Sequence, residues 1–190
     1  MSPSSSVSNK SQRRSNATWR AALGALLMTG LAARGAVGAE TYAMNSVVLL
    51  QPQEIIGARV SSVADLAAYV QALNAAAAKA LEGRSASKAA GYIAVAVRPE
   101  GKAKIWLDFT PALPPELQRP LQSGLEAVAP VNVKEGLVLF AINASLAGAP
   151  AISRLPQPPE WTHATQPGNP ESLDQMVDRI WPTESPATRN

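Results

Sequence analysis

One serine and one lysine in this chain have the spacing of a known type of nucleophilic site. Ser85 and Lys88 match the S-x-x-K pattern, in which a nearby basic group helps a serine hydroxyl attack an acyl carbon. Sites of this type also use S-D-N and K-T-G motifs. Neither motif occurs here, and Lys134-Glu135-Gly136 comes nearest to the second. A polar loop is the preferred interpretation, and a small hydrolase using Ser85 and Lys88 is the alternative.

Two carboxylates form a second possible catalytic group. Asp108 and Glu116 flank one predicted strand-to-helix connection, where they could converge for hydrolysis or for calcium binding. Each residue also has a structural explanation. Asp108 fits the polar side of a strand opposite a lysine, and Glu116 fits the first turn of a helix, which favours negative charge. We prefer these structural roles and keep the pair as the other form of the alternative hydrolase.

Metal and cofactor chemistry has little support in the sequence. The chain has no cysteine, and His163 is its only histidine. Zinc and copper sites rely on nitrogen and sulfur ligands, which are therefore scarce here. His163 lies in a Pro-rich segment, where a general base would lack an orienting partner and a pocket. We expect no catalytic residue, no metal and no cofactor.

Two predicted surfaces are better suited to binding. The solvent-facing side of a predicted hairpin mixes aromatic and basic side chains, and a predicted C-terminal helix carries an apolar stripe. Burial of a large apolar side chain is worth roughly 1.5 to 3 kcal/mol, so the stripe has to be covered. Packing within the same chain, near Trp106, is expected, and a partner's groove is the alternative. The candidate binding residues are Tyr92, Lys104, Trp106, Met176, Ile180 and Trp181.

The first half of the domain is predicted to contain a strand, a helix and a hairpin. An apolar run ends the strand at 42–50. Between Ser62 as N-cap and Gly83 after the last turn, apolar residues recur at helical spacing. The alanines at 75–78 have small side chains, so this helix should lie close to its neighbour. Alternating residues in 91–109 predict a hairpin with one face in the core and the other in solvent.

A second helix and a fourth strand complete the predicted domain, residues 40–147. The helix occupies 113–129, with Pro115 in its first turn and Pro120 shortening or kinking it. The strand is the apolar run 135–146. The resulting order of strand, helix, strand, strand, helix, strand predicts an α+β fold with a small antiparallel sheet, helices on one face and the ferredoxin-like βαββαβ order.

The remaining residues are predicted to form an arm, a helix and a tail. Five prolines in 148–169, followed by Pro170, should prevent regular structure, which predicts an extended linker or a surface-covering arm. An amphipathic helix is predicted for 170–181 and a disordered tail for 182–190.

One part of the predicted domain has its strands and helix in the same order as a known family. Residues 91–146 run strand, strand, helix, strand, which resembles the C-terminal domain of TonB-like periplasmic energy transducers. The resemblance implies an accessory subunit of a cell-envelope complex. The Pro-rich stretch at 148–169 departs from that family, because here it follows the domain instead of preceding it.

The N-terminus has the organisation of a bacterial signal peptide. Four basic residues precede Ala21, and an uncharged apolar run then extends to Ala33. That run is shorter than the roughly 20 residues that span a bilayer, which makes an uncleaved anchor the weaker alternative. Small or short residues at 37–39 predict cleavage after Ala39. Export to the periplasm follows, without stable membrane insertion after cleavage.

Cleavage also changes the charge of the protein. Five of the 17 basic residues lie before Glu40 and all 14 acidic residues lie at or after it, so the mature chain carries a net charge near −2. The basic character of the precursor therefore does not indicate nucleic-acid binding. Together these features predict a periplasmic, non-enzymatic binding protein with a protein partner in the cell envelope. The sequence leaves its oligomeric state open.

Overall fold

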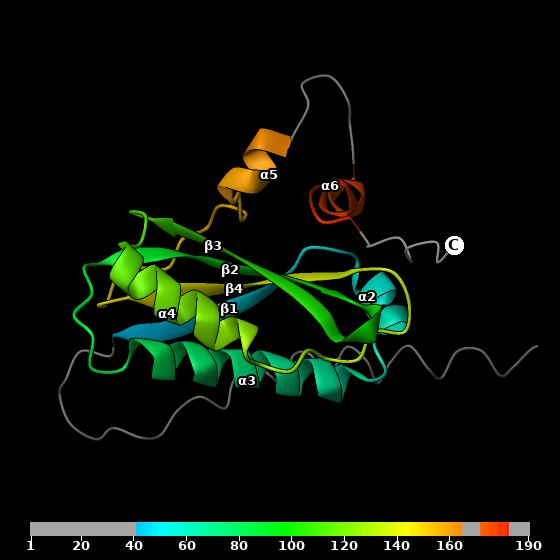
Figure 1. Ribbon diagram of the computed structural model, residues 1–190, viewed down its shortest axis with the longest axis horizontal. Helices are drawn as coiled ribbons and strands as arrows, with labels where there is room; N and C mark the ends of the chain where they lie inside the picture. Colours follow the sequence, from blue (N-terminus) through cyan, green and yellow to red (C-terminus); the bar gives the residue numbers. More distant parts are fainter. Residues whose placement is uncertain (1–40, 165–171, 183–190) are drawn as a thin grey trace, which may run out of the picture. The chain divides into compact units, whose positions relative to one another are not determined.

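The computed structural model describes residues 41–164 and 172–182 (Figure 1). The predicted signal peptide, its cleavage site after Ala39 and most of the predicted tail lie outside the described residues.

An antiparallel sheet of four strands is the centre of the fold. The strands are β1 (Tyr42–Leu49), β2 (Ala89–Arg98), β3 (Lys102–Thr110) and β4 (Val138–Leu146), in the spatial order β1-β4-β2-β3. Because β4 pairs antiparallel with both β1 and β2, those two strands run in the same direction on either side of it. The prediction of an α+β fold with a small antiparallel sheet is confirmed.

Two long helices cover one face of the sheet (Figure 1). They are α3 (Val63–Leu81) and α4 (Pro115–Glu126), and a short helix, α2 (Gln53–Arg59), precedes them. The Ser62 side chain accepts a hydrogen bond from the backbone N–H of Asp65, as the N-cap prediction requires. The sequence did not indicate α2, because no side chain caps it and its one buried residue, Ile56, makes no helical stripe.

Small residues let α3 and α4 approach closely. A Cβ atom added at Gly124 of α4 would lie 3.2 Å from the Cβ of Ala80 and 3.6 Å from the backbone oxygen of Ala76 on α3. The expectation that the alanine-rich helix lies close to its neighbour is confirmed.

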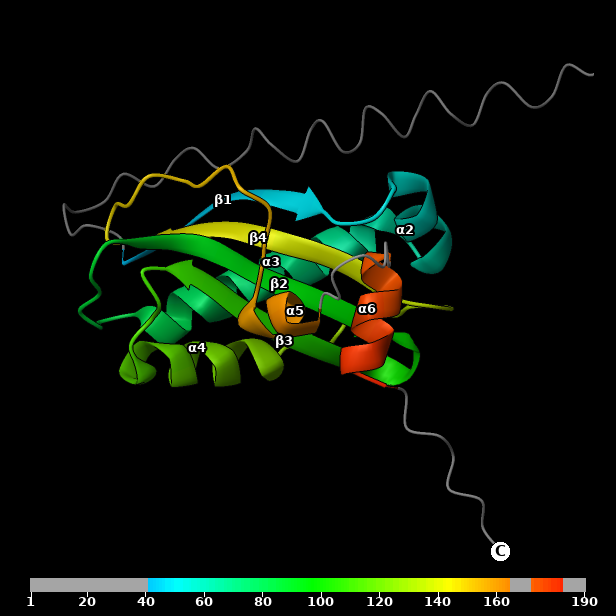
Figure 2. The same ribbon diagram turned by 90° about the horizontal axis from the view of Figure 1, so that it is seen from above.

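The other face of the sheet is also covered, which corrects the prediction that the hairpin has a solvent-facing side. All ten residues of β2 are buried. Helices α5 (Pro159–Ala164) and α6 (Leu173–Ile180) lie over this face, opposite α3 and α4 (Figures 1 and 2). We call it the arm-side face, and residues 147–164 with 172–182 the arm.

Helix α5 corrects the prediction that prolines exclude regular structure from 148–169. Pro159 is its first residue, where the missing N–H costs nothing, and the Pro158 oxygen accepts from the N–H groups of Trp161 and Thr162. Helix α6 begins at Leu173, capped by Ser172 in a reciprocal capping box with Gln175. The predicted start of α6 at Pro170 lies outside the described residues.

Candidate interaction surface

The arm-side face has a flat central area made by small side chains. Ala94 and Ala96 of β2 and Ala141 of β4 are fully buried there, next to Leu139. Alternation along the strands places these residues on one face and the larger core residues on the other. The side chains of the arm that pack on this area are Trp161, Ala164, Met176 and Val177.

Trp106 is the centre of the contact between the sheet and α5. Its ring lies edge-on to that of Trp161, with centroids 5.3 Å apart. The Trp106 Nε1–H donates to the Glu160 carboxylate over 2.7 Å, and the Lys104 ammonium donates to the same oxygen over 2.8 Å. The hydrogen bond from Lys104, with that from Trp106, lowers the pKa of Glu160 against a smaller opposing effect of burial. The ring contact of Trp106 with Trp161 and the ion pair of Lys104 with Glu160 therefore both hold helix α5 to the sheet.

Asp108 anchors the start of the arm. Both of its oxygens accept from the Arg154 guanidinium, over 2.6 and 2.7 Å, and the backbone N–H of Gln157 donates to one of them over 2.7 Å. The hydrogen bond to Asp108 raises the pKa of Arg154. Because Asp108 is almost completely buried, this pairing supplies the partner that its charge requires.

Two aspartates of α6 meet side chains of the core. Asp174 accepts from Gln51 over 2.8 Å and from Arg59 over 3.0 Å. Asp178 forms an ion pair with Arg98, whose guanidinium carbon also lies 4.5 Å from the centroid of the Trp181 ring. Arg98 is only 4% exposed, so its charge depends on this carboxylate and this ring.

The structure brings the candidate binding residues together beneath and within the arm. Tyr92, Trp106 and Met176 are buried in one cluster, and Ile180 and Trp181 pack against it half-buried. Lys104 joins them through Glu160 and lies 5.1 Å from the Trp106 ring. Helix α6 therefore docks on its own domain. The polar partners of the arm were missed, although the two aspartates beside the apolar stripe of α6 gave a sequence signal for basic partners.

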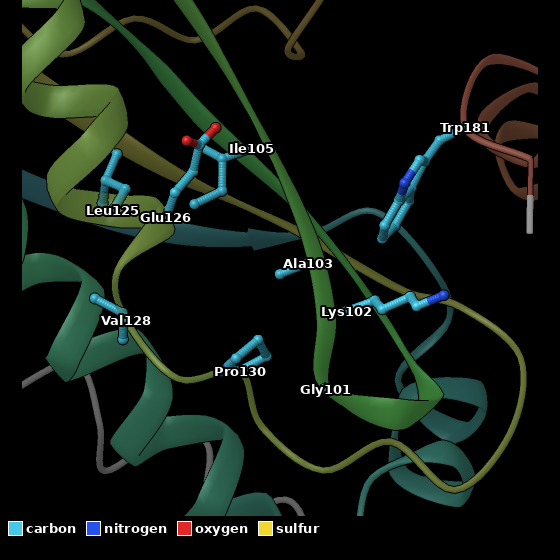
Figure 3. A pocket seen from close by; sticks show the side chains of 9 residues that line it. All are labelled: Gly101, Lys102, Ala103, Ile105, Leu125, Glu126, Val128, Pro130 and Trp181. Atoms are coloured by element: carbon cyan, nitrogen blue, oxygen red, sulfur yellow. The ribbon is translucent and has the colours of Figure 1, made fainter. Parts of the chain in front are cut away.

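An open groove lies at the end of this surface, beside edge strand β3. Its volume is about 390 Å³. Figure 3 shows Trp181 pointing into it from the α6 side, across from Leu125 and Val128. We call it the β3 groove. Its lining residues are Gly101, Lys102, Ala103, Ile105, Leu125, Glu126, Val128, Pro130 and Trp181.

The structure does not bring the candidate catalytic residues together into a site. Ser85 and Lys88 are exposed in the loop between α3 and β2, and no helix begins at Ser85. Glu116 is exposed, whereas Asp108 is buried and binds Arg154 and Gln157 of the arm. His163 is exposed on α5. Among residues 41–164 and 172–182, no three acidic or histidine side chains are grouped to hold a metal ion.

Comparison with known proteins found no match for this chain. No protein family matches it, and no curated protein or solved structure does so at a significant level. Within the described part of the chain, no helix has the length and apolar character needed to cross a membrane.

Proposed function

We propose that this protein is exported to the periplasm and works there as a non-enzymatic binding protein for another protein of the cell envelope. The observation that carries the proposal is the open β3 groove, where partly exposed apolar side chains lie beside an edge strand and an aromatic side chain of the arm. Aromatic side chains such as Trp181 are enriched where proteins bind each other.

The chemistry of the β3 groove supports a protein ligand. Ala103, Ile105 and Val128 give it an apolar wall, while Lys102 and Glu126 put one charge of each sign at its rim. Protein interfaces likewise combine apolar side chains with charged ones at their rim. The outer edge of β3 pairs with no other strand of the described sheet, but the backbone oxygen of Ile105 already accepts a hydrogen bond from Gln122 of α4 over 3.1 Å. An extended ligand that adds a strand here therefore has to displace Gln122 or pair beside it.

Export rests on the N-terminal pattern, with its basic residues, its short apolar run and small residues before Glu40. The accessory-subunit role implied by the TonB-like order of elements is a specific form of the same proposal. The hydrolase remains the rival, and it would require Ser85 with Lys88, or Asp108 with Glu116, to bind a substrate.

Intact mass and crosslinking of the native protein test the proposal. The protein is purified from the periplasmic fraction after treatment of whole cells with a short amine-reactive crosslinker. We expect a mass that begins at Glu40, and a recurrent crosslinked protein. An uncleaved chain in the membrane fraction would contradict export, and a cleaved chain with no recurrent crosslinked protein would contradict the binding role.

A further inference from the structure

We propose that the part of the arm-side face beneath α6 is a receptor site for an acidic amphipathic helix of a partner protein, and that α6 is its resident competitor. The inference rests on the proposed binding function and names the chemistry of the partner. That partner helix carries two carboxylates four residues apart, next to a stripe of apolar side chains.

The charges of the site select an acidic helix. Arg59 and Arg98 lie on the core side of the α6 contact, and each binds one aspartate, Asp174 and Asp178. These two aspartates are four residues apart, so they lie on the same side of a helix. The side chain of Gln51, which is neutral, also donates a hydrogen bond to Asp174 over 2.8 Å. A helix with lysines at these positions would place like charges together.

Because Arg98 is buried, any helix bound at this site has to carry a carboxylate next to it. The Arg98 side chain is 5% exposed, whereas that of its partner Asp178 is 62% exposed. A buried guanidinium without a carboxylate is strongly destabilising, so any helix that replaces α6 has to supply one. An aromatic ring next to that carboxylate would take the place of Trp181 over Arg98.

The apolar part of the site fits one face of a short helix. Met176 and Val177 are the buried residues of α6, and Leu173, Ile180 and Trp181 are partly buried around them. The sheet beneath presents Leu137 and Leu139 with the small alanines of β2 and β4. A surface of small side chains can pack against different apolar side chains more readily than a tightly packed core can.

The dimensions of α6 make exchange feasible. It has eight residues, and a helix of that length is not stable alone in water, so its structure depends on docking. Its contacts with the core include two buried side chains, two ion pairs, the hydrogen bond from Gln51 and the cation–π contact of the adjoining Trp181. A longer helix with the same pattern gains further contacts, including the neighbouring β3 groove, and can compete with α6 despite its tethering.

The test uses the full chain and a fluorescent peptide with the sequence of residues 172–182, measured by fluorescence anisotropy. Asp178→Lys weakens the resident helix by placing an ammonium at Arg98. We expect this variant to bind the peptide at least tenfold more tightly than the unmodified chain does. A control peptide with lysine at both aspartate positions should bind neither protein. Arg59→Glu, added to Asp178→Lys, should remove most of the gained affinity.

Two results would overturn the inference. One is equal peptide affinity for the unmodified chain and Asp178→Lys, including no binding to either; the other is equal binding of the acidic and the lysine peptide. If Asp178→Lys does not fold by circular dichroism, Trp181→Ala replaces it with the same expected results. A recurrent periplasmic crosslinked partner together with failed peptide exchange would reject the receptor site and leave the proposed function standing.

Discussion

Single residues decide how closely β2 and β3 approach and what holds the arm to them. A Cβ atom at Gly91 would lie 2.2 Å from the backbone oxygen of Asp108, so only glycine fits there. Asp108 then binds Arg154 on the arm. The sequence indicated a strand position for Asp108 but not its partner, because Arg154 is 46 residues away and lies in a segment without periodicity.

Gly91→Ala should destabilise the protein. The added methyl group meets backbone atoms of β3, which cannot move without breaking strand pairing. We expect a loss of about 2 kcal/mol or more in the free energy of unfolding, as for an overpacked core. Urea unfolding measures it, with Ser123→Ala on the exposed side of α4 as the control. Equal stability of the two variants would show that β2 and β3 can separate at this point.

Glu160 should make attachment of the arm pH-dependent. The pKa of Glu160 is lowered in the folded protein, so its carboxylate stabilises the fold above its ordinary value of 4.5, and this contribution is lost as the pH falls through the lower folded value. Glu160→Gln should therefore melt below the unmodified protein at pH 7, and the gap should close towards pH 3. A gap that stays constant over this range would exclude an ionic contribution.

The helices and strands that the sequence predicted are those with a clear local signal, such as a capping residue, a first-turn proline or alternating apolar residues. Ser62, Pro115 and the alternating hairpin residues predicted the bounds of α3, α4, β2 and β3 within a few residues. Helices α2 and α5 were missed, since each is too short to show a helical repeat of apolar residues. Pro52 precedes α2 and Pro159 is the first residue of α5, and prolines usually indicate a break in regular structure. The burial of both sheet faces was missed because the covering helices lie far away in the sequence.

Docking of α6 predicts a specific loss of stability. Met176 is 7% exposed on α6, and Met176→Ala should lower the free energy of unfolding by about 2 kcal/mol or more, as for a buried methionine. Leu155→Ala is the matched control, because Leu155 is also apolar and on the arm but is 66% exposed. Urea unfolding of both variants tests the docking. Equal, small effects would mean that α6 does not pack on the sheet in solution.

The described part of the molecule is a sheet covered on one face by α3 and α4 and on the other by the arm (Figure 2). Charged pairs and apolar contacts hold the arm to the sheet. This arrangement leaves the β3 groove open next to Trp181 (Figure 3). The groove could not be predicted from the sequence, because β3, the end of α4 and Trp181 come together only in the folded chain. Export stays a prediction, which rests on a local sequence pattern before Glu40.

Site-specific photocrosslinking in living cells tests the binding role most directly. A photoreactive amino acid is placed at Val128, on the wall of the β3 groove, and in a second strain at Ala64, which is exposed on α3. We predict a discrete crosslinked envelope protein from position 128 and none from position 64. Absence of a crosslinked protein at 128, or the same products at both positions, would contradict a binding function located at this groove.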